Sequence, residues 1–244
     1  MNAMKVRAAA LRAFHTSAGP LAAQSGSSNR WRHRQATDPF VAQAHAQGYR
    51  ARSAFKLLDI QSRFRLLKPG QLVIECGCAP GAWSQVAAPL INAGGHYASD
   101  RPNGQLIGCD LLPVSPLPGV TFLAGADFTH DTVQTQIRDM MSSPAADVVL
   151  SDMAPNASGH GFHDHEALIQ LAYAALKFGL AHGRVGSHFL CKIWSGAREE
   201  AFIANLQRFY RVVHTVKPKS SRSDSAEKFL LALDCLGIKR KAPA

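Results

Sequence analysis

Charged side chains close several apolar runs in this chain, at the points where buried β-strands would reach the surface. An aspartate ends three of these runs and a lysine ends a fourth: Asp110, Asp127, Asp152 and Lys192. Ligands of open α/β sheets bind at the carboxyl ends of the strands, so these residues are the first candidates for chemistry. Asp110 can accept hydrogen bonds from both hydroxyls of a ribose, and Asp127 can reach the edge of an adenine. Each aspartate, taken singly, also fits a loop cap or a solvated strand end.

Lys192 is the most informative of the four, because it lies between Cys191 and Ile193 in an apolar run. A buried ammonium group is costly unless it is paired or functional. The alternative is an edge-strand lysine whose aliphatic stem covers apolar surface while its ammonium reaches water. The pattern favours a functional lysine, which can accept a proton or stabilise a developing negative charge.

A glycine-bearing turn is a candidate ligand-binding loop at the same edge of the predicted sheet. Residues 72–83 read Leu-Val-Ile-Glu-Cys-Gly-Cys-Ala-Pro-Gly-Ala-Trp, which predicts a buried parallel strand, a turn and the start of a helix. Gly77 and Gly81 allow the backbone to turn sharply and to approach a ligand closely, and the free amides of the helix start can face that ligand. The spacing excludes the dinucleotide motif G-x-G-x-x-G, and no Gly-Lys-Ser/Thr follows. Two interpretations of this segment remain: a loop that binds a nucleoside-type ligand, and a turn with a purely structural role.

Apolar runs and helical stretches alternate beyond this turn. We predict strands over 72–76, 105–111, 120–124, 147–152, 186–193, 211–216 and 229–235, and helices over 49–65, 83–92, 130–142, 164–182 and 197–209. The alternation predicts an α/β fold with a mostly parallel seven-stranded sheet and helices on both faces. A short polar link joins the last two strands, so we expect an antiparallel hairpin at one sheet edge. Residues 94–104 read as a surface loop.

Positive charge is concentrated at the start of the chain. The formal net charge is +10. No acidic residue precedes Asp38, and the same stretch contains six basic residues: Lys5, Arg7, Arg12, Arg30, Arg32 and Arg34. An Arg-rich, acid-free beginning is typical of an organelle transit peptide, with a disordered RNA-binding arm as the alternative. We therefore predict a leader over 1–37, one α/β domain over 38–238, a basic tail over 239–244, and a location in the mitochondrial matrix.

Cysteine and histidine clusters suggest metal sites that their spacing does not support. Five cysteines lie in or beside apolar runs, and no second close pair completes a zinc set: Cys76, Cys78, Cys109, Cys191 and Cys235. A second cluster opens a predicted helix: His160, His163, Asp164, His165 and Glu166. His-x-His spacing does not place both rings on one helical face, and acids are expected at a helix start. We predict no metal.

Six segments follow one another in a specific order: Tyr-Arg-Ala-Arg-Ser-Ala-Phe-Lys-Leu-Leu (49–58), Ala-Pro-Gly-Ala-Trp-Ser-Gln (79–85), Cys-Asp-Leu-Leu-Pro (109–113), Ser-Asp-Met-Ala-Pro-Asn (151–156), Cys-Lys-Ile-Trp (191–194) and Lys-Pro-Lys-Ser-Ser-Arg-Ser (217–223). Through them, residues 48–236 resemble the FtsJ-like ribosomal RNA 2′-O-ribose methyltransferases. The long loop at 94–104 is similar to the mitochondrial large-subunit members of that family. The resemblance implies a Rossmann-like, S-adenosylmethionine-dependent fold.

The resemblance also implies roles for individual residues. It implies a catalytic set made of Lys56, Asp152, Lys192 and Glu227. It implies S-adenosylmethionine contacts at Pro80, Gly81, Ala82, Trp83, Asp110, Asp127 and Asp152. Glu75 stands where the family usually has Asp, and its longer side chain should still reach the methionine ammonium. From charge placement near the catalytic set, we expect RNA phosphate contacts by Arg50, Arg52, Lys217, Lys219 and Arg222.

We therefore expect S-adenosylmethionine-dependent 2′-O-methylation of a uridine in mitochondrial large-subunit rRNA, either free or in an assembling large subunit, with a role in subunit assembly. Lys192 would accept the hydroxyl proton, tuned by Lys56 and oriented by Asp152, and Glu227 would position a lysine or the ribose. A non-catalytic RNA-binding assembly factor and a cap-type mRNA 2′-O-methyltransferase are the alternatives. Methylation of an exocyclic base amine is disfavoured, because Asp-Met-Ala-Pro at 152–155 carries no aromatic residue.

Overall fold

A computed structural model describes residues 37–155, 161–222 and 224–237. The compact unit that begins at Pro39 holds every described helix and strand. The strands are β1 (Leu72–Cys76), β2 (Gln105–Asp110), β3 (Val120–Ala124), β4 (Ala146–Ser151), β5 (Gly183–Trp194), β6 (Tyr210–Val216) and β7 (Glu227–Cys235). The helices are α2 (Pro39–Ala46), α3 (Ala54–Phe64), α4 (Ala82–Ile91), α5 (Asp131–Met140), α6 (Gly161–His182) and α7 (Glu199–Phe209).

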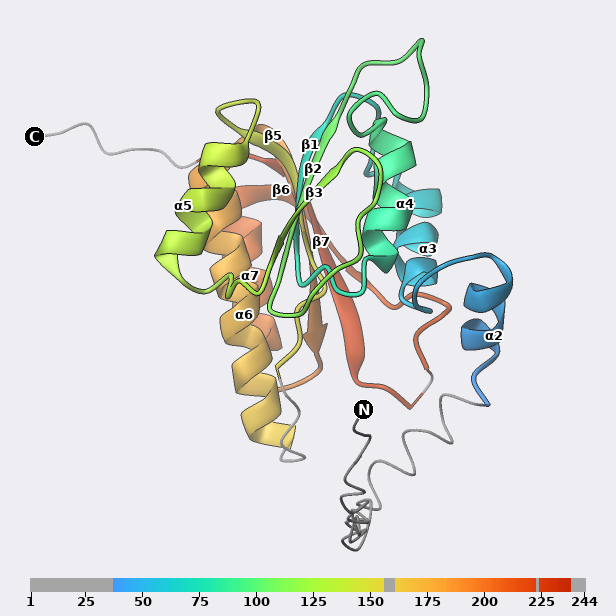
Figure 1. Ribbon diagram of the computed structural model, residues 1–244. Coiled ribbons are helices and arrows are strands. Elements are labelled where there is room, and N and C mark those ends of the chain that lie inside the picture. Colours follow the sequence, from blue (N-terminus) through green and yellow to red (C-terminus); the bar gives the residue numbers. More distant parts are fainter. Residues whose placement is uncertain (1–36, 156–160, 223, 238–244) are drawn as a thin grey trace, which may run out of the picture. The chain divides into compact units, whose positions relative to one another are not determined.

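The strands form one seven-stranded sheet in the order β3-β2-β1-β4-β5-β7-β6 (Figure 1). The pairs among β1 to β5 are parallel, and β7 runs antiparallel to both of its neighbours, β5 and β6. The predicted α/β class and the antiparallel pair of last strands are therefore confirmed. Because β7 inserts between β5 and β6, β6 is the edge strand, and the start of β7 lies beside the end of β5.

Helices cover both faces of the sheet, α3 and α4 on one side and α5, α6 and α7 on the other (Figure 1). Successive strand residues point to opposite faces, and β1 shows this directly. Val73 packs in the core cluster that contains residues of α3 and α4. Ile74 packs in the cluster that contains residues of α5, α6 and α7. Every residue of β1 is buried, as expected for a central parallel strand.

The first two helices differ from the sequence prediction. The helix expected over 49–65 begins only at Ala54, and α2 was not predicted. Gly48 has a φ of 73°, and the main-chain N–H of Arg50 donates to Gln85 Oε1 at 2.7 Å. The segment between Gly48 and α3 is therefore held by a side chain of α4, and it forms turns, with the N–H of Ala54 donating to the carbonyl oxygen of Ala51 at 3.2 Å.

The predicted loop over 94–104 is present and is held by one buried side chain, Asn92. Its amide nitrogen donates to the carbonyl oxygens of Ala98 (2.8 Å) and Arg101 (3.0 Å). Its amide oxygen accepts hydrogen bonds from the main-chain N–H groups of Tyr97 and Ala98 at 3.1 and 2.9 Å. A loop that satisfies its polar groups in this way needs no further secondary structure.

Two predicted segments fall on parts of the chain that the structure does not describe. The leader over 1–37 lies outside the described residues except for Thr37, and the basic tail over 239–244 lies outside them entirely. Both stay predictions. Among the described residues, no helix combines the length and the apolar character that a membrane crossing requires.

Candidate active site

Lys192 is buried at the carboxyl end of β5, where it meets the carboxyl end of the neighbouring strand β4. Its ammonium donates to the main-chain oxygen of Asp152 at 2.6 Å and lies 3.0 Å from Asp152 Oδ1. Lys192 is 8% exposed, and β5 is an inner strand between β4 and β7. The edge-strand interpretation of this lysine is therefore wrong. Parallel pairing brings the two groups together. Ser151 and Cys191 are register partners, Asp152 directly follows Ser151, and Lys192 directly follows Cys191.

A second lysine–carboxylate pair joins α3 to the first residue of β7. Lys56 Nζ donates to Glu227 Oε2 at 2.7 Å, and both side chains are largely buried. The other carboxylate oxygen, Oε1, accepts a hydrogen bond from Ser221 Oγ at 2.9 Å. Both oxygens of Glu227 are thus occupied, so the carboxylate is fixed in one orientation.

Phe229 links the two pairs. It is the register partner of Lys192 across the antiparallel β5–β7 ladder, and its ring centroid lies 5.7 Å from Lys56 Nζ. Partners in an antiparallel ladder share a face of the sheet, as do residues two apart on one strand. Lys192, Phe229 and Glu227 therefore point to the same face, which is the face that α3 covers with Lys56. The four residues expected to form the catalytic set lie on that one side of the sheet.

The turn between β1 and α4 has the predicted glycine geometry. Gly77 has a φ of 76°, and a Cβ at this position would lie 2.7 Å from main-chain atoms of Met153. The N–H of Ala79 donates to Asp110 Oδ2 at 2.7 Å, so the strand-end carboxylate of β2 orders the turn after β1. Only glycine allows this close approach of two strand ends.

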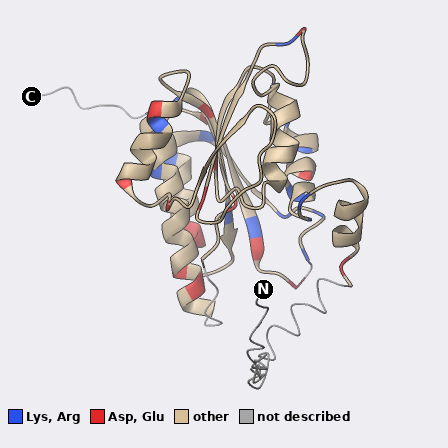
Figure 2. Cartoon of the chain, in the orientation of Figure 1, with Lys and Arg blue, Asp and Glu red and all other residues tan. Residues whose placement is uncertain are grey.

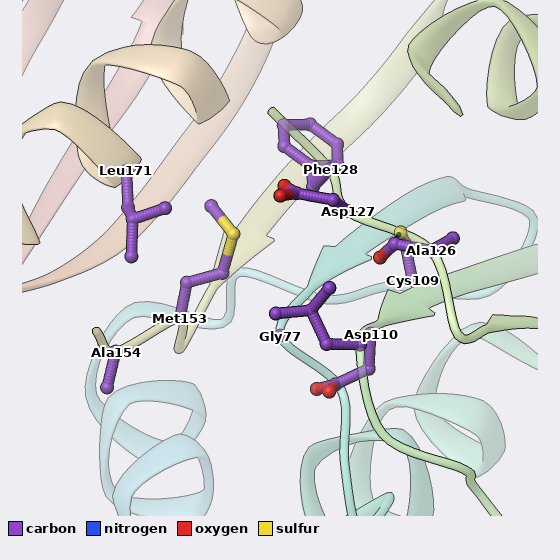
Figure 3. A pocket seen from close by; sticks show the side chains of 10 residues that line it. Gly77, Cys109, Asp110, Ala126, Asp127, Phe128, Met153, Ala154 and Leu171 are labelled. Atoms are coloured by element: carbon purple, nitrogen blue, oxygen red, sulfur yellow. Dashed lines mark hydrogen bonds between the residues drawn. The ribbon is translucent and has the colours of Figure 1, made fainter. Parts of the chain in front are cut away.

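A pocket of about 390 Å³ opens beside this turn (Figure 3). The carboxylates of Asp110 and Asp127 lie on one side, and Met153 and Leu171 lie opposite them (Figure 3). Hydrogen bonds from the hydroxyl and the N–H of Thr129 hold the pKa of Asp127 below its ordinary value. The pocket therefore combines apolar walls with carboxyl oxygen acceptors, which suits a nucleoside.

Glu75 lies at the centre of the sheet and is only 1% exposed. Ser84 Oγ donates to its Oε2 at 2.6 Å, whereas its Oε1 is buried and has no hydrogen-bond partner among the described residues. Burial raises the pKa of Glu75 from 4.5 to about 8, the Ser84 hydrogen bond opposes this shift, and the charges of Asp152 and Asp110 add to it. The side chain is thus a neutral acid at pH 7 until a cation comes to lie beside it.

Comparison with known proteins identifies the family to which this site belongs. Residues 49–235 match the family described as FtsJ-like methyltransferase. This chain belongs to the FtsJ-like methyltransferase family. The resemblance inferred from the six sequence segments is confirmed.

Relatives cover most of the FtsJ-like chain. A Drosophila melanogaster protein named "rRNA methyltransferase 2, mitochondrial" is 42% identical over 217 residues, which are 89% of this chain and 86% of that protein. The "Ribosomal RNA large subunit methyltransferase E" of Bartonella bacilliformis is 43% identical over 86% of this chain and 85% of its own length. A crystal structure of a Plasmodium falciparum protein described as a ribosomal RNA methyltransferase superposes with a TM-score of 0.67 at 25% identity, covering 78% of this chain and 100% of that one.

The predicted cofactor residues of the FtsJ-like chain fall into two groups. Asp110 and Asp127 line the pocket. Trp83 does not: its indole is 2% exposed, donates to the main-chain oxygen of Ser53 at 2.9 Å, and packs 5.6 Å from the ring of Phe229. Its side chain therefore joins α4 to the segment before α3. Ala82 is also buried, whereas Pro80 is exposed on the turn.

Sequence reasoning missed two apolar walls of the pocket, Met153 and Leu171. Met153 directly follows Asp152, and its place in a matched segment was an available signal. Leu171 lies in the middle of α6 and carries no local signal, because only the fold brings it beside the end of β2.

The basic residues predicted to bind RNA make different contacts. Arg52 on the segment before α3 donates to the main-chain oxygen of Ser220, which lies in the link 217–226 between β6 and β7. Lys217 donates to the main-chain oxygen of Ser225 at 3.0 Å, so it also stabilises this link. Lys219 is exposed, and Arg222 is half-buried. Arg50 donates to the main-chain oxygens of Pro80, Ser115 and Pro116.

The histidine cluster is a packing element where the structure describes it. His165 is 4% exposed, its Nδ1 lies 3.1 Å from the main-chain oxygen of Trp194, and its Nε2 accepts the N–H of Arg198 at 3.1 Å. Both ring nitrogens are therefore engaged by the backbone. His160 lies outside the described residues. Within the described ranges, no group of metal-binding side chains is found, and all five cysteines are free and buried.

Charged residues frame this region rather than the centre of the sheet (Figure 2). Figure 2 draws most of the sheet tan, with Lys, Arg, Asp and Glu at strand ends and on the outer helices. The exception is Glu75 at the centre of the sheet, whereas the two lysine–carboxylate pairs are buried at strand ends. Buried, paired charges of this kind are expected where chemistry takes place.

Proposed function

We propose that this FtsJ-like chain transfers a methyl group from S-adenosylmethionine to the ribose 2′-hydroxyl of a uridine in mitochondrial large-subunit ribosomal RNA. One observation carries the proposal: two buried lysine–carboxylate pairs lie on one face of the sheet, at the strand ends next to a nucleoside-sized pocket. The family supplies the reaction class, methyl transfer. The Drosophila and bacterial relatives are named as ribosomal RNA methyltransferases, which supports the substrate.

The residues of the pocket fit S-adenosylmethionine. Asp110 would hold the ribose hydroxyls and Asp127 the adenine edge, while Met153 would cover the apolar faces. Glu75 offers the oxygen that its buried carboxyl group leaves without a partner, and the methionine ammonium would satisfy it. The missing Cβ of Gly77 leaves the backbone open at the turn. When bound, the cofactor supplies an electrophilic methyl group on a sulfonium sulfur.

The protein's own contribution is to align the acceptor and to remove its proton. Alignment of two reactants can lower a barrier by on the order of 7–11 kcal/mol. A ribose hydroxyl is a poor nucleophile, so a base must take its proton as the new bond forms. Lys192 is the proposed acceptor, in the neutral amine form that it reaches by releasing its ammonium proton to solvent, and the carboxylate and main-chain oxygen of Asp152 hold its nitrogen in place.

Lys56 and Glu227 form the second half of the proposed catalytic set. The positive charge of Lys56 favours the neutral amine of a nearby lysine and stabilises negative charge that develops on the ribose oxygen. Glu227 orients Lys56 through the 2.7 Å contact and is itself held by Ser221. This division of roles explains why two separate pairs are present in one site.

The proposed RNA surface comprises Arg52, Lys217, Lys219 and Arg222. The contact between Arg52 and Ser220 places the segment before α3 against the β6–β7 link. Both carry cations near Lys56 and Glu227, the first and last members of the set. Cations in this arrangement hold phosphates and position the strand without reading its sequence.

We place the activity in the mitochondrial matrix. The acid-free, arginine-containing start of the sequence supports this location, as does the name of the Drosophila relative. Bacterial relatives are similarly close in sequence.

The decisive experiment maps ribose methylation on mitochondrial large-subunit rRNA in cells that lack the protein. We expect the loss of one uridine 2′-O-methyl group, its return when the unaltered protein is supplied, and no return with Lys192→Ala. Loss of no site would contradict the function. Return of the methyl group with Lys192→Ala would contradict the catalytic role. If Lys192→Ala restored subunit assembly without methylation, the protein would also act as an assembly factor.

A further inference from the structure

The side chain of Arg50 joins three parts of the backbone that are far apart in the sequence. Its guanidinium donates to three main-chain carbonyl oxygens, at 3.0, 2.8 and 2.9 Å respectively: Pro80, Ser115 and Pro116. Pro80 belongs to the glycine turn after β1. Ser115 and Pro116 belong to the loop between β2 and β3. Arg50 itself precedes α3, so one side chain fixes the relative positions of three segments.

The main chain of the same segment is also anchored to α4. The N–H of Arg50 donates to Gln85 Oε1 at 2.7 Å, and Gln85 Nε2 donates to the main-chain oxygen of Gly48 at 2.9 Å. These two bonds hold the base of the arginine side chain. Arg50 is therefore held at both ends, its main chain by Gln85 and its guanidinium by three carbonyl oxygens.

Gly81 provides the space that the guanidinium occupies. A Cβ on Gly81 would collide with Arg50 Nη1, and the φ of Gly81 is 101°, where side chains are disfavoured. The glycine that opens α4 thus serves two purposes. It permits the turn, and it lets a planar, charged group lie directly against that turn.

The two segments that Arg50 joins both meet residues of the pocket lining. The turn 77–81 contributes Gly77, and Asp110, the last residue of β2, accepts the N–H of Leu112 in the β2–β3 loop on its Oδ1 at 2.8 Å. Asp110 Oδ2 accepts the N–H of Ala79. Asp110 therefore connects the two loops on the inside of the pocket, and Arg50 connects them on the outside.

We propose that Arg50 is a positioning residue of the cofactor pocket, in place of the RNA phosphate contact that its charge suggests. This inference rests on the proposed function, because it assumes that the pocket binds S-adenosylmethionine. Its three bonds to carbonyl oxygens use the forked, planar geometry of arginine, which lysine cannot reproduce. A phosphate contact, in contrast, needs only a positive charge. Substitution by lysine therefore distinguishes the two roles.

The test compares Arg50→Lys and Arg50→Ala with the unaltered protein. Calorimetry measures the affinity for S-adenosylmethionine, and filter binding measures the affinity for an rRNA fragment over a range of salt concentrations. Arg138→Ala removes an exposed arginine of α5 that pairs with Asp139 and serves as the charge control. We expect both Arg50 variants to bind the cofactor about tenfold more weakly or worse, because each loses charge-assisted hydrogen bonds. RNA affinity and its salt dependence should stay unchanged in Arg50→Lys, and Arg138→Ala should bind the cofactor normally.

A cycle with Gly81→Ala provides a second test. If the added methyl group acts by displacing the guanidinium, the double variant Gly81→Ala/Arg50→Ala should bind the cofactor more tightly than the product of the two single effects predicts. If the effects of the two single substitutions on cofactor affinity simply multiplied, the methyl group would not act by displacing the guanidinium.

Three results would overturn the inference. Normal cofactor affinity in Arg50→Lys would show that a charge suffices at this position. Normal cofactor affinity in Arg50→Ala, with weaker and less salt-dependent RNA binding, would restore the phosphate role. Failure of the unaltered protein to bind S-adenosylmethionine would overturn both this inference and the proposed function, whereas the other two results leave the function standing. If Arg50→Ala did not fold, the lysine variant would still decide.

Discussion

Two buried lysines define this molecule at the scale of single residues. Lys192 faces Asp152 and Lys56 faces Glu227, at 3.0 and 2.7 Å. A buried ion pair contributes little net stability, because desolvation offsets the attraction, and apolar residues of similar volume often stabilise a fold as well or better. Two such pairs on one face of the sheet are therefore better explained by chemistry than by folding.

Glu75 makes stability depend on pH in a direction that can be measured. Its pKa is about 8 in the folded chain against 4.5 ordinarily. Between these two values the folded state holds a proton that the unfolded state has lost, so the free energy of unfolding falls as the pH rises and levels off above about pH 8. Glu75→Gln removes this titration and keeps an acceptor for Ser84. We expect the variant to become more stable than the unaltered protein as the pH rises, by on the order of a few kcal/mol near pH 9.

Urea unfolding of the cofactor-free protein at several pH values measures this difference. Glu200→Gln changes an exposed position on α7 and provides the control. Because it keeps Glu75, its stability should follow that of the unaltered protein at every pH. A stability difference between Glu75→Gln and the unaltered protein that does not change with pH would show that Glu75 is ionised in the folded state.

At the scale of elements, the link 217–226 positions Glu227. Ser221 donates to one carboxylate oxygen at 2.9 Å, and Lys56 donates to the other at 2.7 Å. Ser221→Ala removes the first bond, so we expect methyl transfer to slow by about tenfold through loss of one hydrogen bond to a charged group. Cofactor affinity should not change, because the pocket lies at other strand ends.

Single-turnover methylation measures the effect of Ser221→Ala. Ser221→Thr keeps the hydroxyl and should restore most of the rate, and Ser62→Ala, on the exposed side of α3, should have no effect. An equal loss of rate in the alanine and threonine variants would show that the hydroxyl does not act through Glu227.

The sequence anticipated elements according to how locally they are determined. The seven strands are bounded by polar or glycine residues, and their predicted positions agree with the structure to within a few residues. The first turn of the expected helix 49–65 does not form. Arg50 in this segment bonds instead to Gln85 of α4, and a contact across 35 residues leaves no local signal in the sequence. Lys192 stood out from its apolar neighbours alone. Lys56 and Glu227 were found only through the family resemblance, since 171 residues separate the two partners of that pair.

At the scale of the whole molecule, the proposed binding of RNA rests on charge. The net charge of +10 suits a polyanionic partner. Lys219 is exposed on the β6–β7 link. Lys219→Ala should weaken rRNA binding and reduce the slope of log affinity against log salt by about 0.7–0.9, the loss of one phosphate contact.

Salt titrations of fragment binding test this expectation. Lys177→Ala, which removes an exposed lysine on α6 outside the proposed RNA surface, should leave the slope unchanged. If Lys219→Ala and Lys177→Ala gave the same slope as the unaltered protein, Lys219 would not contact a phosphate.

The most direct measurement of the central claim is single-turnover transfer of a labelled methyl group from S-adenosylmethionine to unmodified large-subunit rRNA or subunits. A 2′-O-methyl group blocks alkaline cleavage of the adjacent phosphodiester, so the label should appear in one alkali-resistant dinucleotide that begins with uridine. Lys192→Ala should slow this transfer by about a hundredfold or more, as expected for loss of a general base, while binding cofactor and RNA normally. Label on a base, or normal transfer by Lys192→Ala, would contradict the account.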